Sequence, residues 1–68
     1  MNKLSERLKK VLIETGMSQK ELAQKIGMSQ SVVNNYCSGK REPTLDVLIL
    51  ICDTLDETSD YMLGRKDF

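Results

Sequence analysis

Residues 29–39, SQSVVNNYCSG, combine uncharged hydrogen-bonding side chains with apolar side chains at helical spacing. Val33, Tyr36 and Cys37 recur at intervals of three and four, which predicts the buried face of a short helix that Ser29 can cap. The outward face then carries amides and hydroxyls, from Gln30, Ser31, Asn34 and Asn35. An amide donates and accepts hydrogen bonds at once, so this face could recognise a partner that offers a donor beside an acceptor. The alternative is that each polar side chain is simply solvated.

The sequence offers little material for catalysis. It contains no histidine, the commonest general base and metal ligand. Cys37 and Cys52 both lie on apolar stripes, and two cysteines without histidine provide neither a disulfide framework nor a zinc site. We therefore expect two buried, reduced cysteines and no enzymatic activity, and no metal, cofactor or small-molecule ligand is indicated.

Length and composition indicate one small globular domain. The chain has 68 residues, of which 40% are hydrophobic and 29% charged, enough for a single modest core. No apolar run approaches the roughly 18 residues of a membrane span. The N-terminal MNKLSERLKK is amphipathic, unlike a signal peptide. These features predict a cytoplasmic protein.

Charge is unevenly distributed along a chain that is neutral overall. Residues 1–41 carry eight basic and three acidic side chains, whereas residues 42–68 carry two basic and seven acidic ones. A basic face of the folded domain could attract phosphate while an acidic face repels it, which would also orient the encounter. The alternative is that the segregation is fortuitous.

End signals and apolar stripes predict five helices. Ser18 and Glu21 form a capping box, Thr44 and Thr58 are further N-caps, and Gly27 can adopt the positive φ that ends a helix. The predicted ranges are 3–15, 18–26, 29–37, 44–55 and 59–63. Together they should form a domain over residues 1–64, followed by a loose tail over residues 65–68.

Residues 45–55, LDVLILICDTL, contain six consecutive apolar residues. Such a run could be a buried strand, but the sequence offers no second strand to pair with it, and its length favours a buried central helix. The fold class is therefore a compact all-α, five-helix bundle. Its predicted spine is Leu45, Leu48, Ile51, Cys52 and Leu55.

Two short helices joined by a tight glycine turn, the second polar outside, are typical of a helix-turn-helix, whose second helix enters the DNA major groove. Residues 19–38, QKELAQKIGMSQSVVNNYCS, resemble this motif in the Cro and phage-repressor family, also called Xre-like, and the resemblance extends over residues 4–64. The matching positions are Leu22, Ala23, Ile26, Gly27, Met28, Val33 and Tyr36. The resemblance implies a five-helix domain that binds operator DNA, usually as a homodimer, in bacteria or their phages.

The amides of the third helix suit base recognition. Gln and Asn can bond adenine N6 and N7 together, which discriminates between bases by about 1–3 kcal/mol. The resemblance implies that Gln30, Ser31 and Asn35 contact base edges, with Asn34 a lesser candidate, and Val32 could touch a thymine methyl group. The Asn34–Asn35 pair is less typical of the family, so no operator sequence can be transferred.

Phosphate contacts are expected at the edges of the motif. Ser18 and Gln19 lie where the free amides and dipole of a helix N-terminus favour a phosphate. Lys40 and Arg41 in the following loop supply positive charge. Four other basic residues are weaker candidates for phosphate contact. We expect Lys20 and Lys25 to be simply solvated, and Arg7 and Lys10 are distant candidates on the first helix.

We therefore expect a sequence-specific transcriptional regulator, a repressor that binds a palindromic operator as a homodimer. By family analogy the dimer surface would involve the fourth and fifth helices. One alternative is an interaction module, such as an antitoxin or anti-repressor, that binds its partner through Met62, Leu50 and Phe68. Another is that the chain is the N-terminal part of a longer regulator.

Overall fold

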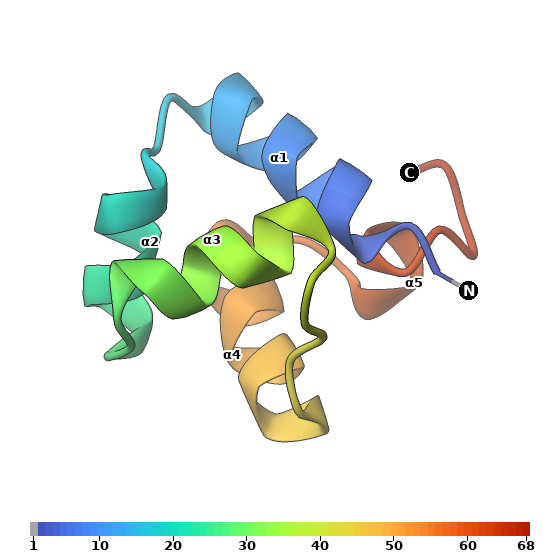
Figure 1. Cartoon of the computed structure of the whole chain (residues 1–68). Coiled ribbons are helices and arrows are strands. Elements are labelled where there is room, and N and C mark those ends of the chain that lie inside the picture. Colours follow the sequence, from blue (N-terminus) through green and yellow to red (C-terminus); the bar gives the residue numbers. More distant parts are fainter. Residues whose placement is uncertain (1) are drawn as a thin grey trace.

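The computed structural model describes residues 2–68, in which five α-helices follow one another without strands (Figure 1). Their bounds are α1 Leu4–Thr15, α2 Gln19–Ile26, α3 Gln30–Ser38, α4 Leu45–Leu55 and α5 Ser59–Met62. The predicted all-α, five-helix fold is confirmed. α3 packs against α1 and α2, α4 packs against α2, and α5 packs against α1 and α4.

Side-chain caps define where four of the helices begin. The hydroxyls of Ser18, Ser29, Thr44 and Thr58 each accept a hydrogen bond from the backbone amide three residues later, at 3.0–3.3 Å. Each cap satisfies an amide that has no carbonyl partner within its helix. These bonds between residues three apart determine where α2–α5 begin, without any tertiary contact.

The core draws on all five helices. One residue of each helix is completely buried: Leu8, Leu22, Val33, Ile51 and Met62. The remaining core residues are Leu4, Val11, Leu12, Ala23, Ile26, Tyr36, Cys37, Leu48, Cys52, Leu55 and Tyr61. Met62 was assigned to a partner-binding surface in the interaction-module hypothesis, and its burial shows that this assignment is wrong.

α4 is not buried on every side as its sequence suggested. Leu48, Ile51, Cys52 and Leu55 face the core, but Leu45 is 78% exposed and Ile49 and Leu50 are 56% and 41% exposed. Leu45 is therefore not part of the spine. The reason is geometric, because a helix packed mainly against α2 and α5 can bury about half of its circumference.

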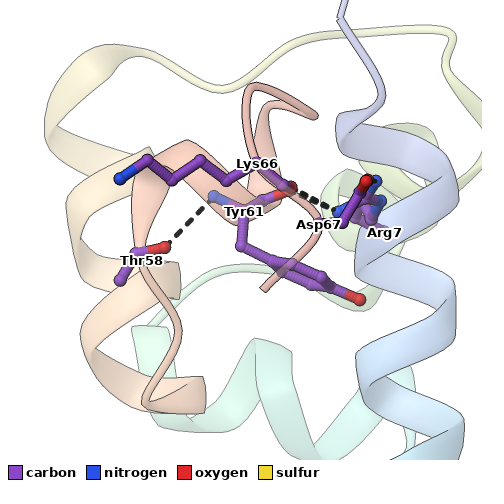
Figure 2. Close-up of polar contacts among 5 residues, drawn as sticks. All are labelled: Arg7, Thr58, Tyr61, Lys66 and Asp67. Carbon is purple, nitrogen blue, oxygen red and sulfur yellow. Dashed lines mark hydrogen bonds and ion pairs between the residues drawn. The ribbon is translucent and has the colours of Figure 1, made fainter.

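Residues 65–68 are attached to α1, in contrast to the loose tail that we expected. The Arg7 guanidinium donates hydrogen bonds to the carbonyl oxygens of Tyr61 and Lys66 and pairs with the Asp67 carboxylate (Figure 2). The backbone amides of Arg65 and Lys66 also donate to the carbonyl oxygen of Asp60. Arg7 is thus engaged within the domain, which removes it from the candidate phosphate contacts.

Both cysteines are buried and free, as expected. Burial raises the pKa of the Cys37 thiol, an effect that the charge of Lys9 partly opposes. Burial also raises the pKa of Cys52, and the carboxylates of Asp53 and Glu57 act in the same direction. Both thiols therefore stay protonated near neutral pH. None of the helices within residues 2–68 combines the length and apolar content that a membrane span requires.

Asp56, which ends α4, adopts a left-handed conformation with φ 55° and ψ 45°. Asp tolerates this conformation better than Ala because its short polar side chain bonds locally. We expect Asp56→Ala to lower the free energy of unfolding by about 1 kcal/mol. The control is Asp53→Ala in the same helix, which should be neutral or slightly stabilising. Urea titration of both variants measures this difference, and equal losses would contradict the conformational explanation.

Candidate nucleic-acid interface

The turn between α2 and α3 fixes the relative positions of the two helices. Gly27 has φ 72°, and the Met28 amide donates to the Ala23 carbonyl oxygen at 2.9 Å. Ala23 is almost completely buried, on a helix that packs against α3. A longer side chain at this position would push the two helices apart. The small residue and the glycine therefore set how α3 is presented.

α3 has one buried and one polar face. Val33, Tyr36 and Cys37 point into the core. The predicted base-contacting residues occupy the rest of the surface: Gln30, Ser31 and Asn34 are exposed, and Asn35 is half-buried, as is Val32. The structure thus brings all four predicted polar residues onto one nine-residue helix, with their amides and hydroxyls accessible to a ligand.

The N-terminus of α2 is partly occupied by its own capping box. The Glu21 amide donates to Ser18 Oγ at 3.0 Å, and the Ser18 amide donates to Glu21 Oε1 at 3.2 Å. The amides of Gln19 and Lys20, at the first two helical positions, have no carbonyl partner within α2. An anion here would therefore meet these two amides and the Ser18 hydroxyl rather than the Ser18 amide.

The loop after α3 is tied to the end of that helix. The carbonyl oxygen of Asn35 accepts hydrogen bonds from the amides of Lys40 and Arg41, at 3.0 and 3.3 Å, and from Ser38 Oγ at 3.2 Å. Both basic side chains are exposed. Lys40 and Arg41 are therefore held next to the C-terminal end of α3. The sequence alone shows only that they follow this helix.

Sequence reasoning missed a contact that joins the N-terminus to this loop. Asn2 Nδ2 donates to Glu42 Oε2 at 2.6 Å, while Asn2 Oδ1 accepts from the Leu4 amide at 2.9 Å. The second bond is an Asx turn, for which an Asn just before a helix is a usable sequence signal. The bond to Glu42 spans 40 residues and leaves no such signal.

Exposed charge differs between elements. α2 and the loop after α3 carry four exposed basic side chains, Lys20, Lys25, Lys40 and Arg41, against the exposed acidic Glu21 and Glu42. On α1 the exposed Lys9 and Lys10 are balanced by Glu6 and Glu14, and the other exposed basic residues, Lys3, Arg65 and Lys66, lie near the two ends of the chain. The exposed acidic residues Asp46, Asp53 and Asp56 belong to α4 and its exit. A polyanion would therefore be attracted to the α2–α3 elements and their loop more strongly than to α4.

Comparison with known proteins agrees with this architecture. A helix-turn-helix family model, HTH_3, matches residues 8–62. The chain is 31% identical over 64 residues to the HTH-type transcriptional regulator ImmR of Bacillus subtilis, covering 94% of this chain and 50% of ImmR. It is 33% identical over 63 residues to the cryptic phage CTXphi transcriptional repressor RstR of Vibrio cholerae, covering 93% of this chain and 56% of RstR.

A solved structure has the same fold. A transcriptional regulator from Listeria innocua superposes with a TM-score of 0.87 at 22% identity, covering 94% of this chain and 60% of the regulator. The chain spans about half the length of the curated relatives ImmR and RstR. The family match over residues 8–62 confirms the resemblance seen in the sequence. The chain belongs to the Xre and Cro-like helix-turn-helix family of transcriptional regulators.

Proposed function

We propose that the protein is a sequence-specific repressor that binds a palindromic operator as a homodimer, with α3 in the major groove. One observation carries the proposal: the exposed face of α3 presents amides and hydroxyls on a helix fixed by a helix-turn-helix. RstR, which is named a transcriptional repressor, supports the direction of regulation. Cytoplasmic localisation in a bacterial or phage-encoded setting follows from the same proposal.

Gln30, Ser31 and Asn35 read base edges in this proposal, and Asn34 contributes less. Gln30 is the first residue of α3, so its exposed side chain can reach forward into a groove that the helix enters N-terminus first. Asn35 is half-buried, so its amide has less freedom to lose when it bonds a base. Half-buried Val32 is suited to a thymine methyl group.

Phosphates on either side of the groove are bound by two groups of residues. Ser18 and Gln19 contact one phosphate through the hydroxyl and the helix N-terminal amide. Lys40 and Arg41 contact another through charge, from a loop held to Asn35. These contacts fix the position of the domain on the duplex and carry no sequence information.

A second copy is part of the proposal because one α3 reads little DNA. Its nine residues extend over about 13 Å, so one copy can contact only a few base pairs. Two copies on half-sites about one helical turn apart would double the sequence that is read. The exposed apolar residues of α4, Leu45, Ile49 and Leu50, support self-association, because such patches are typical of protein contacts.

Arg41→Ala should weaken binding to all DNA sequences alike and reduce the slope of log affinity against log salt by about one per copy, or about two for the homodimer, because each copy loses one phosphate contact. Arg65→Ala is the matched control, since Arg65 is exposed at the opposite end of the sequence from the motif. Fluorescence anisotropy with specific and random duplexes at several salt concentrations measures both effects. A loss confined to the specific duplex would instead place Arg41 among the base-reading residues.

The proposal as a whole is tested by selecting random duplex DNA with the purified protein at near-physiological salt and sequencing the retained fraction. Enrichment of a two-fold symmetric motif would support a dimeric operator-binding protein. Enrichment of a single half-site would support DNA reading and contradict the homodimer. No enrichment by a protein that is folded by circular dichroism would contradict the proposal and favour the interaction module.

A further inference from the structure

α5 is too short to be stable on its own. It contains four residues, whereas isolated helices shorter than about 12 residues are marginal in water. Its place in the fold therefore depends on tertiary contacts: Tyr61 and Met62 are buried, and α5 packs against α1 and α4. Figure 1 shows α5 and the C-terminus near the N-terminal part of α1, away from α2.

Arg7 joins α1 to both α5 and the tail. Its guanidinium lies 4.4 Å from the centre of the Tyr61 ring. It donates to the carbonyl oxygens of Tyr61 at 3.1 Å and Lys66 at 3.0 Å, and to Asp67 Oδ1 at 3.1 Å (Figure 2). The planar, five-donor guanidinium can stack on the ring and bond these three acceptors together, which a lysine ammonium cannot do.

The connection between α4 and α5 begins at Asp56. Asp56 is the one non-glycine residue with positive φ among residues 2–68, and it separates α4 from the residues that follow. Within residues 58–68 the backbone bonds are mostly internal: Met62 and Leu63 donate to Thr58 and Ser59, and Arg65 and Lys66 donate to Asp60. The segment thus has many internal hydrogen bonds. Its links to the rest of the domain are the Arg7 contacts, the bond from the Lys3 amide to the Leu63 carbonyl oxygen at 3.3 Å, and the burial of Tyr61 and Met62.

We propose that residues 58–68 form a C-terminal unit that opens separately from the rest of the domain, and that the Arg7 contacts hold it closed together with the burial of Tyr61 and Met62. Opening exposes Met62, Tyr61 and the apolar surface of α1 and α4 that they cover. The α2–α3 pair packs on α1 and α4 and makes no main packing contact with α5, so it stays in place. Whether or not the protein binds DNA, this end of the domain can therefore expose apolar surface without unfolding the helix-turn-helix.

Among the contacts that Arg7 makes, the hydrogen bonds and ring stacking of its guanidinium should hold the unit more strongly than the ion pair with Asp67. Asp67 is 92% exposed, and surface ion pairs of this kind contribute little. The Arg7 side chain is only 12% exposed, and its bonds to backbone carbonyl oxygens are charge-assisted. Arg7→Lys should therefore open the unit, whereas Asp67→Asn should scarcely affect it.

Amide hydrogen exchange read by NMR tests the proposal. In Arg7→Lys, the amides of Leu63, Arg65 and Lys66 should exchange about tenfold faster or more, while amides in α2 and α3 change less than about threefold. Asp67→Asn should accelerate the same amides by less than about threefold. Lys10→Met is the matched control, because Lys10 is an exposed basic residue on the same helix, and it should leave all these rates unchanged.

A measurement on the unmodified protein completes the test. At low urea concentrations, the amides of residues 62–66 should exchange with a smaller urea dependence than amides of α3, because a local opening exposes less surface than global unfolding. The proposal is overturned if the two groups of amides show the same urea dependence. It is also overturned if Arg7→Lys accelerates exchange equally in all helices or leaves residues 62–66 unchanged.

Discussion

Leu48→Ala should lower the free energy of unfolding by about 3 kcal/mol, whereas Leu45→Ala, three residues away in the same helix, should change it by less than about 0.5 kcal/mol. The two substitutions remove the same atoms. Leu48 is 8% exposed and lies in the core, so its truncation loses apolar burial and leaves a cavity, while Leu45 is 78% exposed and loses almost nothing.

The expected loss at Leu48 is a large part of the total stability, which for a domain of this size is roughly 3–10 kcal/mol. Urea titration with a common slope for the three proteins measures both differences. Equal losses at the two positions would show that Leu45 is buried in solution. Repeating the titrations of the unmodified protein and of Leu45→Ala over a range of protein concentrations then shows whether a second copy covers Leu45. A dimer contact makes the stability of the unmodified protein depend on concentration, and Leu45→Ala should weaken that dependence.

The parts of the fold that could be predicted from the sequence are those set by neighbouring residues. Ser29 and Thr44 cap their helices through bonds to amides three residues away, so residue type and spacing are sufficient. Gly27 ends α2 because its own φ is positive, which also needs no knowledge of distant residues. The polar face of α3 follows in the same way, since the helical period places Ser31 on the side of the helix opposite Val33 and Tyr36.

The features that could not be predicted depend on residues far apart in the chain. The apolar run in the sequence shows that α4 has more apolar residues than one buried face can hold. It does not show which of them, such as Leu45, are exposed in the folded domain. The attachment of the tail depends on Arg7 meeting Lys66 and Asp67, which lie 59 and 60 residues away. From the sequence, Arg7 on a basic helix is a candidate phosphate contact. Only the tertiary structure shows that its N–H groups already bond Tyr61, Lys66 and Asp67.

The candidate interface shows the same division. The exposure of Ser31 and Asn34 could be predicted from helical phase. The bonds that hold Lys40 and Arg41 to the Asn35 carbonyl oxygen could not, because they depend on how the chain turns after Gly39. That turn means that Asn35 has two roles. Its side chain lies on the proposed base-reading surface, while its backbone positions the phosphate-binding loop. Substitution of the side chain alone can therefore separate reading from positioning.

Gln30→Ala and Asn35→Ala should each reduce affinity for the selected operator about 10- to 100-fold per half-site while leaving affinity for random DNA nearly unchanged, because each removes a pairing that discriminates bases by about 1–3 kcal/mol. The fold should survive both changes. Alanine is a better helix former than either residue, and the Asn35 carbonyl that holds Lys40 and Arg41 is unaffected. Asn34→Ala should have a smaller effect, since Asn34 is the lesser candidate.

Gln24→Ala in α2 is the matched control, because Gln24 is an exposed glutamine outside the proposed base-reading residues. Affinities for the selected and a random duplex at one fixed salt concentration give a specificity ratio for each variant, and this ratio should fall for Gln30 and Asn35 but not for Gln24. If Gln30→Ala weakened both duplexes equally, Gln30 would be a phosphate contact. If Asn35→Ala left the ratio unchanged, base reading would have to be assigned to the remaining polar residues of α3.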